Sequence, residues 1–107
     1  MEDSTTEPLI VRIEGPDWDL SRIKEFEAKI QPAYEHPNVV VDLSEVEYVD
    51  STVLNEFAKK RKVRAEKGWR PSRLVLTQRV RKIFHAVRYD EIWPIFDSLA
   101  EALEKAC

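Results

Sequence analysis

The apolar residues of this chain form short continuous runs that alternate with longer stretches of helical spacing. The continuous runs occupy residues 9–14, 39–43, 74–76 and 92–96. Runs of this length indicate strands, and the valine-rich run at 39–43 is typical of a strand buried on both faces. Pro94 lies within the last run and indicates a strand at the edge of the sheet, where a missing hydrogen-bond donor does no harm.

Between these runs, apolar side chains recur every three or four residues, which predicts four helices with one apolar face each. Suitable N-cap residues precede the four helices, namely Asp19 or Ser21, Asp50, Thr77 and Ser98. The predicted inner faces are Leu20, Ile23, Phe26, Ile30 and Tyr34 in the first helix, Val53, Leu54, Phe57, Ala58 and Ala65 in the second, Val80, Ile83, Phe84 and Val87 in the third, and Leu99, Ala102, Leu103 and Ala106 in the fourth. Arg61 falls within the stripe of the second helix, so it must extend its charge to solvent or pair with a carboxylate.

The alternation of strands and helices predicts an α/β fold with right-handed crossovers and a mainly parallel sheet of four or five strands. The fifth strand would come from residues 1–8, which either form an antiparallel edge strand or are disordered. At 107 residues the chain has the length of one domain, so we expect residues 1–107 to be a single domain.

Composition restricts the possible functions. The two glycines are too few for a Walker loop, a dinucleotide fingerprint or the elbow of a serine hydrolase. No apolar run approaches the ~18 residues of a membrane span, so we expect no membrane insertion. The acidic start of the chain does not resemble a signal peptide, and the single cysteine, Cys107, cannot form a disulfide within the chain. We therefore expect a protein of the reducing cytoplasm.

Charge is distributed unevenly along the chain. The formal net charge is −3, yet residues 59–82 contain eleven basic residues and only one acidic residue, Glu66. Such a segment indicates either an anionic partner or helix faces that are exposed to solvent. In the second case the acidic remainder of the folded chain balances the positive charge of the segment, and we favour this interpretation. Direct nucleic-acid binding is not expected, because the segment carries no recognisable RNA-binding motif.

Residues with catalytic or metal-binding chemistry are few. His36 lies beside a proline, and His85 lies off the apolar stripe of the third helix. Neither histidine has the neighbours at metal-ligand spacing that a zinc site needs. At the chain end, Cys107 has no activating base beside it. We therefore expect no enzyme activity, no metal and no cofactor.

The segment Asp50-Ser51-Thr52 stands out because it leads from a buried strand into a helix. Asp50 is a good N-cap, which makes Ser51 the first residue inside the helix. Free backbone N–H groups and the positive end of the helix dipole lie there, so a phosphate on Ser51 would be tolerated. A phosphate adds about −1.5 to −2 charge, which would change a docking surface while the fold survives. The alternative interpretation is that the segment only caps the helix.

This segment and its surroundings resemble the STAS domain of bacterial anti-sigma factor antagonists. The similarity runs from about Leu9 to Ala106, through a strand that ends in glycine, the run at 39–44, Tyr48 to Thr52, and the strand and helix at 74–84. The resemblance implies a four- or five-stranded sheet with helices packed mainly on one face.

The resemblance also implies a role in transcription regulation. Such antagonists bind an anti-sigma factor, often a serine kinase, which then phosphorylates the serine and ends the interaction. Ser51 would be the phosphoacceptor, with Thr52 as a substitute, and Asp50, Ser51, Thr52, Val53 and Asn55 would contact the partner. The sequence departs from the family at Val53, where a glycine is usual, and at Asn55 and Glu56, which replace small or apolar residues.

This departure leaves an alternative function open. The chain would then be a STAS docking subunit of a lipid-transport or membrane-transport complex, with no phosphorylation at Ser51. A third interpretation, an enzyme or nucleotide-binding domain, rests only on the basic segment and the anion site at the helix start.

Overall fold

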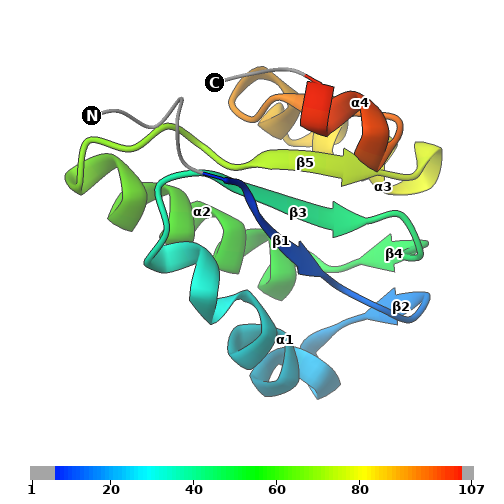
Figure 1. The fold of residues 1–107 in the computed structure, drawn as a ribbon. Helices are drawn as coiled ribbons and strands as arrows, with labels where there is room; N and C mark the ends of the chain where they lie inside the picture. Colours follow the sequence, from blue (N-terminus) through cyan, green and yellow to red (C-terminus); the bar gives the residue numbers. More distant parts are fainter. Residues whose placement is uncertain (1–6, 105–107) are drawn as a thin grey trace.

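Four parallel strands form the central sheet in the computed structural model of the protein, which describes residues 7–104 (Figure 1). Their order across the sheet is β1 (Leu9–Arg12), β3 (Val39–Leu43), β5 (Arg73–Leu76) and β6 (Ile95–Phe96). The predicted parallel α/β architecture is confirmed. The prediction for residues 1–8 lies largely outside the described residues.

Every residue of β3 is buried, as its valine-rich sequence predicts. The strand lies between β1 and β5, with Leu9 paired to Val39 and Val41 paired to Leu74. Two shorter strands, β2 (Asp17–Trp18) and β4 (Tyr48–Val49), form a separate parallel pair beyond the carboxyl ends of β1 and β3 (Figure 1). The sequence analysis did not predict this pair, because two residues are too few to show a pattern.

Three helices cover one face of the sheet and one covers the other (Figure 1). The first three are α1 (Ile23–Ile30), α2 (Ser51–Glu66) and α3 (Gln78–Ala86), and the fourth is α4 (Leu99–Glu104). Short 3-10 turns lie between these helices and neighbouring strands, with Leu20–Arg22 before α1, Gln31–Tyr34 after α1 and Tyr89–Glu91 after α3. Packing mainly on one face is confirmed. On the opposite face, Ala102 of α4 packs against Val40 and Val75.

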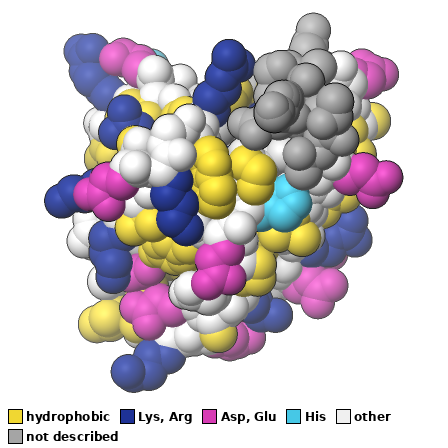
Figure 2. Space-filling view, turned by 60° about the vertical axis from the view of Figure 1, so that its left-hand side comes forward, with side chains coloured by type: hydrophobic (Ala, Val, Ile, Leu, Met, Phe, Trp, Pro, Cys, Tyr) yellow, Lys and Arg dark blue, Asp and Glu magenta, His cyan; other side chains and the backbone are white. Residues whose placement is uncertain are grey.

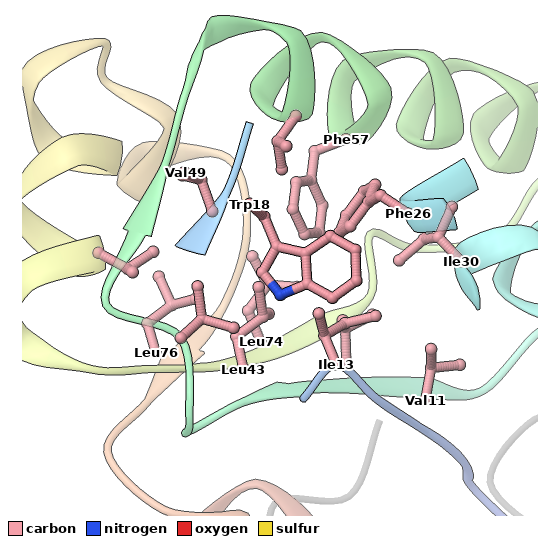
Figure 3. Packing of buried hydrophobic residues seen from close by; sticks show 14 of the residues in the cluster. Val11, Ile13, Trp18, Phe26, Ile30, Leu43, Val49, Phe57, Leu74 and Leu76 are labelled. Atoms are coloured by element: carbon pink, nitrogen blue, oxygen red, sulfur yellow. The ribbon is translucent and has the colours of Figure 1, made fainter. Parts of the chain in front are cut away.

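Aromatic side chains fill the main core between the sheet and the three helices (Figure 3). Phe57 of α2 occupies its centre, with ring centroids 5.7 Å from Phe26, 5.6 Å from Phe84 and 6.1 Å from Trp93. Trp18 packs edge-on against Phe26 at 5.8 Å. These contacts tie α1, α2 and α3 to one another and hold the first half of α2 against the core.

The inner face of α2 differs from the prediction. Val53, Leu54 and Phe57 are buried as predicted, but Ala58, Arg61 and Ala65 are exposed. The positions that continue the buried stripe are Lys60 and Arg64, at 0% and 1% exposure. The helical spacing is the same, but the charged residues on the inner face are Lys60 and Arg64 instead of the predicted Arg61. Leu20, Val87 and Leu103, also predicted to face inward, are exposed at the ends of their elements.

Arg64 joins two connections at the amino-terminal edge of the sheet. Its guanidinium donates to the carbonyl oxygens of Ala33 at 2.8 Å, Pro37 at 2.9 Å and Arg70 at 3.1 Å, and also to that of His36. One buried side chain therefore satisfies backbone acceptors on both the segment before β3 and the segment before β5.

Lys60 is buried without a hydrogen-bond partner among the described residues. Its ammonium nitrogen lies 4.7 Å from the centre of the Phe57 ring. Burial lowers the pKa of Lys60 well below its usual value, and the nearby Arg64 cation lowers it further.

Candidate functional site

Asp50 organises the start of α2. Its Oδ1 atom accepts the backbone N–H groups of Thr52 at 3.0 Å and Val53 at 3.3 Å, together with the Thr52 hydroxyl. Its Oδ2 atom accepts the backbone N–H of Leu20 at 2.9 Å. Asp50 is therefore the predicted N-cap and also a link between α2 and the segment that follows β2.

These contacts favour the charged form of Asp50. Burial raises the pKa of this carboxyl, but the hydrogen bonds from Thr52, Val53 and Leu20 outweigh burial and leave the pKa below its usual value. The start of α2 consequently carries a permanent negative charge at neutral pH.

Ser51 is the first residue of α2, and its side chain is exposed. Thr52 is half-buried, and its hydroxyl donates to Asp50. Among the described residues, no hydrogen bond holds the Ser51 hydroxyl. The geometry therefore favours Ser51 over Thr52 as an acceptor of a phosphoryl group.

The side chain of Val53, one of the predicted partner contacts, is not accessible at the surface. Val53 is 0% exposed, because it is the first residue of the buried stripe of α2. Its extra bulk compared with glycine points into the core rather than toward a partner. Asn55 is exposed, whereas Glu56 is buried and pairs with Lys59 at 2.9 Å. Of the predicted contacts, Asp50, Ser51, Thr52 and Asn55 remain available at the surface.

Two exposed apolar side chains lie close in the chain to residues that Asp50 binds or follows, and the sequence had not indicated that either is exposed. Leu20 is 65% exposed, and its backbone is bound by Asp50. Tyr48 is 46% exposed on β4, two residues before Asp50. Large exposed apolar residues that gather beside polar ones indicate a surface that binds another molecule. Protein interfaces combine apolar and aromatic side chains with polar groups, and Leu20 and Tyr48 supply the apolar part here.

The folded chain neutralises much of the basic segment 59–82. Lys60, Arg64 and Arg73 are buried. Lys59 and Arg79 pair with Glu56 and Glu47, Arg81 pairs with Asp97, and Lys67 donates to the Tyr34 carbonyl oxygen. The exposed cations of this segment with no ion pair inside residues 7–104 are Arg61, Lys62, Lys67, Arg70 and Lys82. Acidic and basic side chains also mix around apolar ones on the face in Figure 2.

The described residues hold no cluster of His, Cys, Asp or Glu arranged for a metal ion. His85 contacts Asp90 at 2.7 Å, and His36 accepts the backbone N–H of Asn38 at 3.1 Å. Cys107 lies outside the described residues. Over residues 7–104, no helix combines the length and the apolarity that crossing a bilayer requires.

Comparison with known proteins places this geometry in a family. A sequence model of the family described as "Mlab, STAS domain" matches residues 1–101. The comparison with curated protein sequences gives no match.

Solved structures share the fold at low sequence identity. A Thermotoga maritima protein described as an anti-sigma factor antagonist superposes with a TM-score of 0.75 at 20% identity, covering 99% of this chain and 90% of its own. The unphosphorylated form of the anti-sigma factor antagonist SpoIIAA gives a TM-score of 0.63 at 18% identity, covering 91% and 86%. A sulfate transporter family protein from Wolinella succinogenes gives 0.70 at 16% identity, covering 91% and 82%.

Proposed function

The chain belongs to the STAS family, and from this premise we propose that it is a non-enzymatic, cytoplasmic anti-sigma factor antagonist that binds an anti-sigma factor or serine kinase through the start of α2. Phosphorylation of Ser51 ends the binding. The single observation that carries this proposal is the exposed Ser51 hydroxyl at the first position of a helix whose cap, Asp50, is fully hydrogen-bonded. Leu20 and Tyr48 supply apolar contacts beside it.

The position of Ser51 suits a switch that leaves the fold intact. A negative charge at the start of a helix is favourable by roughly 0.3–1 kcal/mol. The same charge on an exposed interface alters partner binding strongly, because a partner that fits a neutral hydroxyl must accept a dianion in its place.

A pull-down from the native cytoplasm tests this proposal with wild-type, Ser51→Ala and Ser51→Asp baits. We expect a serine kinase-like protein on the first two baits and not on the third. Incubation of the complex with ATP should add one phosphate to the wild type and none to Ser51→Ala, as measured by mass spectrometry. Ser98→Asp is the matched control, because Ser98 is also exposed and caps α4 on the opposite face of the sheet.

The alternative function, a docking subunit of a transport complex, has support of its own. The family description names Mlab, and one structural neighbour comes from the sulfate transporter family. In this case all baits, including Ser51→Asp, should capture the same transporter or ATPase, and no phosphate should appear on Ser51. That result would contradict the phosphorylation switch and retain the docking surface.

A further inference from the structure

A groove lies between α2 and the segment that runs from α1 to Glu35. Its volume is about 550 Å³, which falls in the range of pockets that hold small molecules, roughly 300–1,000 Å³. Ser51 does not line this groove, so the groove is a separate feature from the proposed docking surface.

Glu56 supplies a buried carboxylate to the groove. Its side chain is 8% exposed, and its two oxygen atoms have different surroundings. The Oε2 atom accepts a hydrogen bond from the Lys59 ammonium at 2.9 Å. Within residues 7–104, the donor nearest to Oε1 is the Tyr34 hydroxyl at 3.5 Å. Hydrogen bonds from a hydroxyl to an oxygen are about 2.5–3.0 Å long, so Oε1 is a buried acceptor without a hydrogen bond of normal length.

Tyr34 places a second acceptor beside this oxygen, on the other side of the groove. Burial raises the pKa of Tyr34, and the Glu56 carboxylate raises it further, so the hydroxyl stays neutral at physiological pH. A neutral hydroxyl oxygen accepts hydrogen bonds as well as donating one. An ammonium group carries three donors on one nitrogen and can therefore serve both Tyr34 and Glu56.

The surroundings of Glu56 favour an ammonium over other cations. A guanidinium binds a carboxylate best through both oxygens, and Lys59 already occupies one of them. A quaternary ammonium has no N–H group to donate to the free oxygen. The part of the chain that the structure describes contains no group of side chains arranged for a metal ion.

Two further carboxylates, Glu27 and Glu35, line the opposite side of the groove from α2. Both residues are exposed, and neither has an ion pair among the described residues. The two lysines of the lining, Lys59 and Lys67, each donate to an acceptor of the chain itself. Glu27 and Glu35 are eight residues apart, or roughly 12–16 Å at the rise of α and 3-10 helices. One ammonium cannot contact both, whereas a chain that carries several can.

We propose that this groove binds a linear aliphatic polyamine, with one ammonium between Glu56 and Tyr34 and the others beside Glu27 and Glu35. The side chain of a lysine on a partner protein offers the same ammonium chemistry. It carries a single charge, however, and leaves the other carboxylates of the groove unpaired, so a free polyamine fits the site better. This inference goes beyond the proposed function and does not depend on it.

Isothermal titration of the full chain with spermidine at physiological salt tests the proposal, and we expect saturable binding of one molecule. Glu56→Gln keeps the size of the side chain but removes its charge, so it should weaken binding about tenfold. Tyr34→Phe removes one acceptor and should weaken binding about threefold. Wild-type affinity in both variants, or no saturable binding to the wild-type chain at millimolar spermidine, would overturn the proposal.

A pair of double variants separates this site from general attraction to an acidic protein. Glu27→Gln/Glu35→Gln should weaken spermidine binding about tenfold. The matched control, Glu14→Gln/Glu45→Gln, also removes two exposed carboxylates, but these follow β1 and β3 at the carboxyl ends of the strands. The control should bind like wild type. Equal weakening in the two double variants would show that spermidine does not bind in the groove.

Lys59 provides a test in the opposite direction. Lys59→Gln frees the second oxygen of Glu56 and removes a neighbouring cation, so spermidine should bind about threefold more tightly. Lys62→Gln removes the same charge from an exposed position of α2 that does not line the groove, and it should bind like wild type. The same gain in both variants, or a loss in Lys59→Gln, would contradict the position of the site.

Other cations test the class of ligand in the same titration. Butylamine, butylguanidine, a peptide with a single lysine, and Mg²⁺ should all bind more weakly than spermidine. Tighter binding of butylguanidine or Mg²⁺ would overturn the assignment of an ammonium. Tighter binding of the lysine peptide would assign the groove to a partner's side chain and overturn the free polyamine. Ser51→Asp should bind spermidine like wild type, so the result is independent of whether a kinase recognises the protein.

Discussion

The carboxylate of Asp50 accepts the backbone N–H of Leu20 at 2.9 Å, although thirty residues separate the two in the chain. Its other oxygen caps α2 at the same time. One side chain therefore fixes the helix start that presents Ser51 and also the turn that exposes Leu20. Asp50 therefore holds both segments that flank the proposed docking surface around Ser51.

Replacing Asp50 should loosen this arrangement. Asp50→Ala removes the helix cap and the link to Leu20, and we expect a loss of about 1–2 kcal/mol in the free energy of unfolding. Asp50→Asn retains one acceptor oxygen, so it should lose less. Urea denaturation of the three proteins measures the difference, and an alanine variant as stable as wild type would contradict the linking role.

The lowered pKa of Asp50 gives this contribution a pH dependence. A carboxyl whose pKa is lower in the folded state stabilises the fold above its unfolded pKa and loses that contribution as the pH falls through the folded value. The stability advantage of wild type over Asp50→Asn should therefore shrink as the pH falls below about 4. Chemical denaturation at several pH values tests this, and an advantage that grows on acidification would refute the assignment.

Arg64 should be more important to stability than its neighbours on α2. Arg64→Met leaves buried carbonyl oxygens without a donor, and we expect a loss of about 3 kcal/mol or more. Arg64→Lys should also lose stability, because a single ammonium cannot reach all the acceptors that the guanidinium binds. Arg61→Met is the control, since Arg61 is exposed, and it should change stability by less than about 0.5 kcal/mol. Similar losses in both methionine variants would contradict the structure.

Lys60 should reduce stability at neutral pH, because its burial leaves a polar group without a partner. Lys60→Met has a similar shape, and we expect a gain of about 1–3 kcal/mol.

The pH dependence of this gain follows from the lowered pKa of Lys60. Unfolding takes up a proton between the lowered folded pKa and the usual value, so wild-type stability rises with pH across that range. Lys60→Met should lack this rise, and its advantage should be largest at low pH. Denaturation between about pH 6 and pH 10 provides the measurement, and a variant less stable throughout that range would show that Lys60 stabilises the fold.

Gly68 ends α2 with φ +79°, a conformation that disfavours residues with a Cβ atom. Apart from the glycine itself and its two chain neighbours, no atom of the described residues lies within 4 Å of the position that a Cβ would occupy, so the backbone alone opposes substitution. We expect Gly68→Ala to lose about 1 kcal/mol and Gly68→Asn to lose less, because asparagine tolerates this conformation better. Thermal unfolding of both variants distinguishes this backbone effect from a steric one.

Most of the architecture could be predicted from the sequence, and a few particular residues show why. The valines of β3 carry no alternation, which a strand covered on both faces requires. Asp50, Thr77 and Ser98 cap their helices as predicted, each accepting a backbone N–H. Caps act over three residues, so local sequence determines them.

The charged core of α2 could not be predicted in the same way. Lys60 and Arg64 continue the spacing of Val53 and Phe57, and this period is the signal that could have identified them. Burial of Arg64 depends on carbonyl oxygens about thirty residues away, which no local pattern reveals. Leu20 was predicted to face inward and is exposed, and the exposure of Tyr48 was not predicted, because Tyr48 lies on a strand of only two residues.

The parallel order of the sheet also affects how the chain folds while it is being synthesised. Leu9 pairs with Val39, and Val41 pairs with Leu74, so each pairing must wait for an intervening helix to be made. A nascent chain therefore carries β1 as a solitary strand until β3 has left the ribosome, and β5 exposes a free edge until Ile95 arrives. Long-range closures of this kind slow folding compared with a helical bundle of equal length. Translation pauses after β5 should therefore favour aggregation more than pauses within α4.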